Sequence, residues 1–191
     1  MMKKILNYAF LLLAGTFLLA SCLPEENEEA LKYQGSTYVE FKNQTLGILA
    51  STLRARGVVT STAQTDSSRV IAAKQYSTTS GTTTTTTAAR TVDSVLVQLV
   101  GPHRSTPTEV TFEVIAGSTA VQGTDFTLDA ANTGNKVVIP ANSSFGYILL
   151  KPIVGGSAAG TTKRVGFKLL DAGEVKASPN YDTFYVSIFQ P

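Results

Sequence analysis

Side chains that could perform covalent or metal chemistry are scarce in this 191-residue chain, which contains one histidine and one cysteine. His103 lies in the polar stretch Gly-Pro-His-Arg-Ser, which is typical of an exposed turn, and a catalytic triad would have to use it. One histidine and one cysteine cannot supply the ligand set of a structural zinc site. A glycosidase needs a pair of facing carboxyl groups, whereas Glu109 and Glu113 share the outward face of one predicted, edge-like strand. We therefore predict a protein that is not an enzyme and that has no cofactor.

The segment before the cysteine has the layout of a secretory signal peptide. Two lysines precede an apolar run, residues 5–20, that contains no charged side chain, and small residues follow it. This order of charge, apolar residues and small residues is that of a cleavable export signal. The run is also shorter than the roughly 20 apolar residues that a permanent spanning helix needs. We predict that residues 1–21 are removed from the mature protein.

The end of this segment, Leu19-Ala20-Ser21-Cys22, resembles a bacterial lipobox. The resemblance implies that the peptide bond before Cys22 is cut and that its thiol is acylated with a fatty acid such as palmitate. The alternative is a free thiol near the end of an uncleaved helix, but an unpaired cysteine is unusual in an exported protein. Several acyl chains would hold the protein on a membrane, because each buried methylene contributes about 0.8 kcal/mol. Cys22 is therefore the predicted site of lipid attachment.

An acidic stretch follows the cysteine and includes Glu25, Glu26, Glu28 and Glu29. It is too polar to bury, so residues 22–35 are predicted to form a flexible tether. The stretch also resembles the acidic sorting signals that bring lipoproteins of one Gram-negative lineage to the outer face of the outer membrane. That resemblance implies lipid anchoring in the outer membrane and display at the cell surface. A periplasm-facing position is the alternative, since acidic tethers also serve for solvation alone.

The charge of the predicted mature chain argues against one class of partner. Residues 1–21 carry two of the 16 basic residues, which leaves 14 basic and 14 acidic residues. A chain near neutrality without a basic block is not expected to bind nucleic acid. The expected partners are the membrane, through the lipid anchor, and a glycan or protein ligand. The roughly 170 remaining residues suffice for one domain with a proper core.

Apolar residues alternate with a period of two from residue 38 onward, which predicts β-strands, and no segment shows a helical period. Many short strands without helices predict an all-β fold, an antiparallel β-sandwich, over residues 36–191. The predicted strands cover 38–42, 92–100, 109–116, 136–140, 144–154, 163–170 and 182–189, with weaker patterns at 57–60 and 68–72. The expected core residues are Phe112, Val114, Ile148, Leu150, Phe167, Leu169, Val186 and Ile188.

Two segments read as loops or turns rather than as core strands. Residues 77–89 contain six consecutive threonines and no charge. Threonine favours strands but has nothing apolar to bury here, which predicts an exposed loop or an irregular hairpin. Gly155, Gly156 and Gly160 predict a hairpin loop and not a nucleotide site, because no helix follows them.

Three motifs in the second half of the chain form a recognisable series: Val-Thr-Phe-Glu-Val at 110–114, Gly-Thr-Asp-Phe at 123–126 and Val-Val-Ile-Pro-Ala at 137–141. With these motifs, roughly residues 92–189 resemble a Calx-β repeat. The resemblance implies an Ig-like Greek-key sandwich. The layout as a whole is similar to that of small surface lipoproteins that pair such a sandwich with a lipobox.

Some Calx-β members bind calcium through carboxylates gathered at one end of the sandwich. The loop that usually supplies these acids, residues 155–164, contains none in this chain. A calcium site needs about six to eight oxygen ligands. Asp125, Asp129 and Asp171 are weak calcium candidates because they are scattered, and Asp125 is better explained as a turn residue. No metal site is predicted.

The remaining function classes are binding and assembly. The first hypothesis is a non-catalytic, lipid-anchored cell-envelope protein whose sandwich presents loops to a glycan, a protein or a neighbouring lipoprotein. Candidate contacts are the 77–89 segment and the aromatic residues Tyr33, Tyr76 and Tyr181. The alternative is a structural subunit of a surface fibre or envelope complex that docks by strand addition. Oligomeric state distinguishes the two, since a fibre subunit should not stay monomeric at high concentration.

Overall fold

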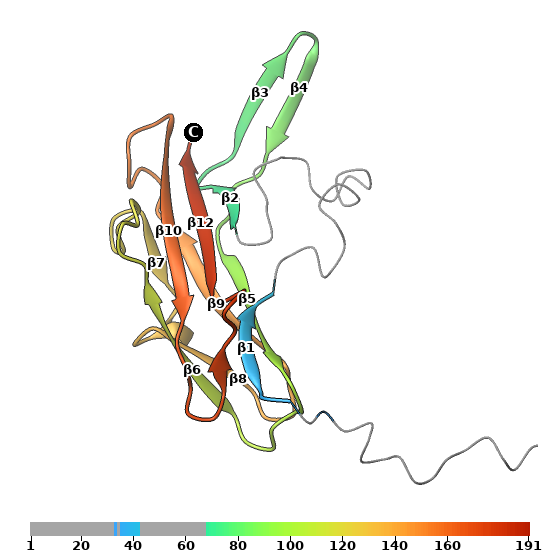
Figure 1. Cartoon of the computed structure of the whole chain (residues 1–191). Coiled ribbons are helices and arrows are strands. Elements are labelled where there is room, and N and C mark those ends of the chain that lie inside the picture. The colour runs from blue at the N-terminus through green and yellow to red at the C-terminus, as the bar shows by residue number, and fades with distance from the viewer. Residues whose placement is uncertain (1–32, 34, 43–67) are drawn as a thin grey trace, which may run out of the picture. The chain divides into compact units, whose positions relative to one another are not determined.

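Two β-sheets lie face to face in the computed structural model, which describes residue 33, residues 35–42 and residues 68–191 (Figure 1). Sheet A contains β1 (Tyr38–Phe41), β5 (Asp93–Val100), β7 (Phe126–Leu128), β9 (Phe145–Pro152) and β11 (Lys176–Ala177). Sheet B contains β2 (Ser68–Ala72), β6 (Thr108–Val114), β8 (Lys136–Ile139), β10 (Thr161–Leu169) and β12 (Thr183–Gln190). The order of strands is β11-β1-β5-β9-β7 in sheet A and β2-β12-β10-β6-β8 in sheet B. The predicted β-sandwich is confirmed.

The chain changes sheet with each successive strand from β5 to β12. Residues 153–160 therefore carry the chain from β9 in sheet A to β10 in sheet B, and the prediction of a hairpin loop there is wrong. Glycines mark a turn but do not determine which strand the chain meets after it. Neighbouring strands pair antiparallel except β1 with β11 and β2 with β12, which pair parallel.

The strands predicted over the described residues are all present, with bounds that differ by two residues or fewer. The described part of the chain contains no α-helix and one 3₁₀ turn, η3 (Ala130–Asn132). None of its helical segments has the length and apolarity to cross a bilayer. The weaker strand pattern at 57–60, the signal segment and Cys22 lie outside the described residues. The edge-like position expected for β6 is wrong, because β6 pairs with β10 on one side and β8 on the other.

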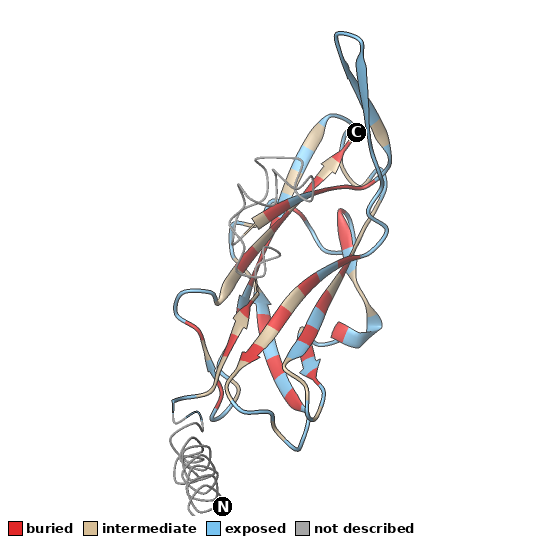
Figure 2. Cartoon of the chain, turned by 90° about the vertical axis from the view of Figure 1, so that its right-hand side faces the viewer, coloured by how far each residue is buried: buried red, intermediate tan, exposed pale blue. Residues whose placement is uncertain are grey.

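The threonine-rich segment forms a regular hairpin of β3 (Tyr76–Ser80) and β4 (Thr83–Thr87), so the hairpin alternative is correct and the loop alternative is wrong. The hairpin projects from the end of the sandwich, and almost all of its residues are exposed (Figures 1 and 2). Hydroxyl groups pair across the strands, Ser77 with Thr86 at 2.9 Å and Thr79 with Thr84 at 3.1 Å. The two strands form a sheet of their own, and the outer edge of each is unpaired within the described residues.

The core lies between the two sheets. Along most strands of the sandwich, buried residues alternate with exposed or half-buried ones (Figure 2). Seven of the eight predicted core residues are buried, and Val114 at the end of β6 is partly buried against the same cluster. Phe167 is the centre of an aromatic group: its ring contacts Phe112 and Phe126 edge-on at 5.6 and 6.4 Å between centroids. Burial of each such side chain contributes about 1.5–3 kcal/mol relative to exposure.

A buried ion pair joins the two sheets. Arg69 on β2 of sheet B donates to Asp93 on β5 of sheet A from Nε at 2.7 Å and from Nη2 at 2.5 Å. Both side chains are 2% exposed. Arg69 also lies over the ring of Phe184, with 5.4 Å from Cζ to the centroid, and Arg90 is 3.7 Å from the other carboxylate oxygen. The pair fixes edge strand β2 to the opposite layer as well as to its own sheet.

A buried amide joins the sheets on the other side of the sandwich. Asn132, at the end of η3, donates from Nδ2 to the carbonyl oxygens of Lys136 on β8 and Tyr147 on β9, at 2.9 and 3.0 Å. Its Oδ1 accepts the N–H of Leu149 at 2.8 Å. Nearby, Gly146 lets the layers approach closely, because a Cβ there would lie 2.6 Å from Val137 Cγ1.

Candidate functional site

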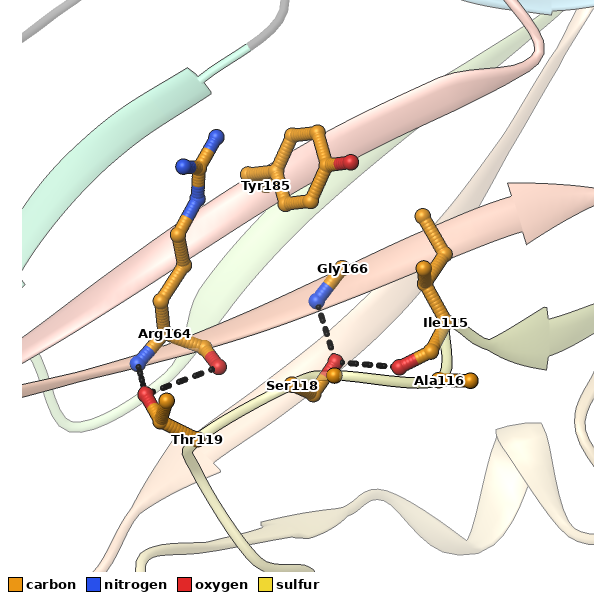
Figure 3. Close-up of a pocket in the computed structure, with 8 residues that line it drawn as sticks. Ile115, Ala116, Ser118, Thr119, Arg164, Gly166 and Tyr185 are labelled. Carbon is orange, nitrogen blue, oxygen red and sulfur yellow. Dashed lines mark hydrogen bonds between the residues drawn. The ribbon is translucent and has the colours of Figure 1, made fainter.

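A pocket of about 370 Å³ lies where the segment after β6 meets β10 and β12 of sheet B (Figure 3). Small-ligand pockets span about 300–1,000 Å³, so this one is sized for a small group. The pocket is lined by Ile115, Ala116, Gly117, Ser118, Thr119, Arg164, Gly166 and Tyr185.

Residues 115–119 form one wall and are held on β10 by a mixture of backbone and hydroxyl bonds. The N–H of Ile115 donates to the carbonyl of Gly166 at 2.8 Å. The hydroxyl of Ser118 accepts the N–H of Gly166 at 3.0 Å and donates to the carbonyl of Ile115 at 2.7 Å. Thr119 accepts the N–H of Arg164 at 2.8 Å through its hydroxyl and donates its own N–H to the Arg164 carbonyl at 2.7 Å. Beyond the end of β6, the two hydroxyls thus accept backbone N–H groups of β10 that a neighbouring strand would otherwise bind. These bonds make the wall rigid.

The floor of the pocket depends on a glycine. Gly166 on β10 is the cross-strand partner of Tyr185 on β12. A Cβ at Gly166 would lie 2.6 Å from Tyr185 Cε1 and 2.9 Å from Ile115 Cδ1. The missing side chain therefore leaves the space that the tyrosine ring occupies, as a glycine inside a strand often does.

Arg164 lies against the same ring. Its guanidinium carbon is 3.8 Å from the centre of Tyr185, which is the short end of the range for a cation–π contact. Arg164 makes no ion pair with any described residue. Further along β10, Lys168 is the cross-strand partner of Glu113 on β6, so the nearest cation on this face of the strand has a carboxylate opposite it. The pocket therefore has a positive group that lies over an aromatic ring.

The lining has no carboxylate, imidazole or thiol. It provides an aromatic ring, a planar set of guanidinium N–H donors and a phenol hydroxyl. These groups can hold a ligand by contact and hydrogen bonds.

No family model and no curated protein matches this chain. Solved structures show partial likenesses. A candidate carbohydrate-binding protein of Bacteroides ovatus is 8% identical with a TM-score of 0.45, covering 81% of this chain and 37% of its own. A two-domain protein of unknown function from Bacteroides fragilis is 9% identical with a TM-score of 0.49, covering 88% of this chain and 51% of its own. The apo Calx CBD1 domain is 21% identical with a TM-score of 0.40, covering 52% of this chain and 82% of its own.

This chain thus spans about a third to a half of the two Bacteroides proteins. Calx domains, the source of the resemblance seen in the sequence, are among the structural neighbours. At TM-scores below 0.5 these likenesses assign no ligand to this chain.

The three weak calcium candidates are each engaged by other groups of the protein. Asp125 is buried and accepts the N–H of Val121 at 2.7 Å and the hydroxyl of Ser157, so it is a turn residue as expected. Asp129 is ion-paired with Lys151 at 2.6 Å, and that bond together with the N–H of Ala131 holds its pKa below the usual value. Among the described residues, no three side chains of the types that bind metals lie together.

Asp171 lies apart from the other two candidates, between β10 and β11. It accepts the N–H of Ala177 at 2.9 Å and pairs with Lys176 at 3.1 Å. The N–H of Ala177 first, and Lys176 second, hold the pKa of Asp171 below the usual value. The carboxylate is used to fix the turn that leads into β11.

The other residues singled out from the sequence lie outside the pocket. His103 is exposed in the loop between β5 and β6. Glu109 pairs with Lys136 on the neighbouring strand β8 at 2.7 Å. Tyr76 packs edge-on against Phe189 with 5.1 Å between centroids, and so anchors the base of the hairpin. Tyr33 and Tyr181 are 46% and 45% exposed.

Sequence reasoning missed Arg164 and Tyr185. One signal for them was present: Gly166 interrupts the apolar strand Val165-Gly166-Phe167, and a glycine inside a strand pattern suggests close approach by another group. The sequence could not show that Tyr185 is that group, because β12 follows β10 only after a detour through sheet A.

Proposed function

We propose that this chain is a non-catalytic, lipid-anchored protein of the cell envelope that binds a glycan in the pocket formed by residues 115–119, Arg164 and Tyr185. The observation that carries this proposal is the arrangement of Gly166, Tyr185 and Arg164. It holds an aromatic ring and a planar donor group at fixed positions beside a cavity of about 370 Å³. Sugars present apolar C–H faces edged by hydroxyls, which such a combination of ring and donors complements. A rigid site of this kind loses little conformational entropy on binding.

Replacing Tyr185 with alanine should weaken glycan binding about tenfold or more, because ring contact and the support of Arg164 are lost together. The full chain carrying Cys22→Ala, which removes the lipid, would be screened on a glycan array and its best ligand measured by calorimetry. Tyr147→Ala is the matched control, since Tyr147 is an exposed tyrosine on the outer face of sheet A, where it pairs with Leu96. Equal affinity of the Tyr185→Ala variant and the parent for that ligand would refute the assignment of the pocket.

Lipid anchoring is supported by the lipobox resemblance and the signal layout of the sequence. We expect Cys22→Ala to abolish labelling by a palmitate analogue and to change the processing of residues 1–21, because the lipobox resemblance ties both events to the cysteine. Metabolic labelling and the mass of the product measure the two effects. The matched control is Ser21→Ala, which keeps a small residue at the cleavage position. A Cys22→Ala protein that still takes up the label and is processed as before would contradict the anchor.

One observation favours the alternative function, a subunit of a surface fibre or envelope complex. The β3–β4 hairpin is exposed, carries no charged residue and leaves the outer edges of both strands unpaired within the described residues. Unprotected edges of this kind can add a strand from another chain. The hairpin strands are only five residues long, which limits the area such pairing would bury, and we therefore rank this function second.

A further inference from the structure

We infer that the ligand of this pocket is an acidic sugar, whose carboxylate is bound by the guanidinium of Arg164. This inference rests on the proposed function, because it names the class of glycan that the same pocket takes. Three features of the described residues carry it: the charge of Arg164, which no described carboxylate pairs, the engagement of the wall hydroxyls within the protein, and the contact of the guanidinium with the ring of Tyr185.

The charge of Arg164 is not neutralised within the described part of the chain. Ion pairs there engage Arg69, Arg90, Lys136, Lys151 and Lys176, each with an aspartate or glutamate. Arg164 has no such partner, and Lys168 and Glu113 on the next row of the sheet face each other. A pocket with this net charge attracts an anion and disfavours a cation.

The hydroxyls of Ser118 and Thr119 in the pocket wall are engaged within the protein. The hydroxyl of Ser118 accepts the N–H of Gly166 and donates to the carbonyl of Ile115. The hydroxyl of Thr119 already accepts the N–H of Arg164 and lies 3.5 Å from its carbonyl. Arg164, by contrast, offers only donors, and it has five. A neutral sugar brings hydroxyls that need acceptors as well as donors, whereas a carboxylate only accepts, so the carboxylate is the better complement.

The ring of Tyr185 restricts where the guanidinium lies. Arginine binds carboxylates through two parallel N–H···O bonds when its fork is held in one orientation, and charge-assisted bonds of this kind are roughly twice as strong as neutral ones. The contact with the tyrosine ring, 3.8 Å from Cζ to the centroid, holds the guanidinium beside the pocket before any ligand arrives. Lysine cannot replace this function, because its ammonium is a point charge without a planar fork.

The test compares charged and uncharged forms of the same sugar on the full chain carrying Cys22→Ala. The probes are the trisaccharide of galacturonic acid with its methyl ester, and sialyllactose with lactose, measured by calorimetry at fixed ionic strength. We expect at least one acidic probe to bind about tenfold or more tightly than its uncharged counterpart. Arg164→Gln should reduce that ratio to about one, and Arg164→Lys should recover only a small part of it.

Lys168→Gln is the control for charge, because it removes one positive group from the same face of β10 without touching the lining. It should leave the preference within about twofold. Sodium acetate, added as a competitor at the concentration of the sugar, shows whether the pocket binds an acidic sugar specifically or any small carboxylate. Displacement of the trisaccharide by equimolar acetate would overturn the sugar assignment.

The two proposals fail in different ways. If glycans bind and Tyr185→Ala abolishes binding, but acidic and neutral probes bind equally or Arg164→Gln leaves the preference unchanged, the acidic-sugar inference is wrong and the proposed function stands. If neither the array nor these probes show any binding, both are wrong.

Discussion

Replacement of Asp93 with alanine is expected to lower the free energy of unfolding by about 3–5 kcal/mol, among the largest effects of any single change in the sandwich. The change leaves the guanidinium of Arg69 in the core at 2% exposure without its carboxylate. Arg90 cannot take over as a partner, since it is a cation. Urea unfolding of the full chain measures the effect. Glu113→Ala, which removes an exposed carboxylate from β6, is the control and should cost less than about 0.5 kcal/mol.

The ion pair as a whole is expected to contribute far less to the free energy of unfolding than the loss on removing one partner suggests. Burial raises the pKa of Asp93 and lowers that of Arg69, despite their mutual attraction. Both directions mean that taking the two charges out of water outweighs the favourable contact between them. A double variant, Arg69→Met with Asp93→Leu, should therefore recover most of the loss, to within about 2 kcal/mol of the parent. A single variant that loses less than about 1 kcal/mol would show that Arg69 finds water or another partner.

Replacement of Asn132 with leucine is the second change with a large expected effect, a loss of about 3–5 kcal/mol. Leucine has a similar volume, but it leaves two carbonyl oxygens and one N–H without partners between β8 and β9. Each buried polar group left unsatisfied costs about 1–3 kcal/mol. Urea unfolding gives the total, and hydrogen exchange gives the local part, because the amide of Leu149 should exchange faster than in the parent.

Asn180→Leu is the control for this change, since Asn180 is exposed in the turn between β11 and β12. Its stability should stay within about 0.5 kcal/mol of the parent. If Asn132→Leu behaves like this control, water must satisfy the three backbone groups, and the amide is not what joins the two layers on that side.

Local pattern was enough to predict the strands and most of the core. The alternation of Val110, Phe112 and Val114 with polar residues could only be accommodated by a half-buried strand, and β6 is that strand. The same pattern could not give the order of strands, because pairing within each sheet joins segments far apart in the chain. The misplaced hairpin loop at 153–160 and the misjudged position of β6 both have this cause.

The local sequence pattern also could not predict the partners or the burial of single polar residues in the core. Asp93 begins a run of β-branched and apolar residues and gives no sign that its partner is Arg69 in the other sheet. Asn132 follows a short turn and reads as a surface residue, although it is 2% exposed. The pocket has the same character, since Tyr185 and Arg164 come together only through the pairing of β10 with β12. The role of each of these residues depends on contacts between the two layers or between strands that are distant in sequence.

The alternation of strands between layers also bears on how quickly the chain can fold. Among the described strands of the sandwich, no two that are consecutive in sequence are hydrogen-bonded to each other. Each pairing therefore requires the chain to close a loop between distant segments, which costs conformational entropy. Among the described strands, the one pairing between neighbours in sequence is β3 with β4, and apart from Tyr76 its residues are exposed, so it is a poor nucleus for folding. We therefore expect folding on the timescale of about milliseconds to seconds, in a single step that involves both layers at once. Removal of a strand from either sheet would then slow the folding of the whole sandwich and not of one sheet alone.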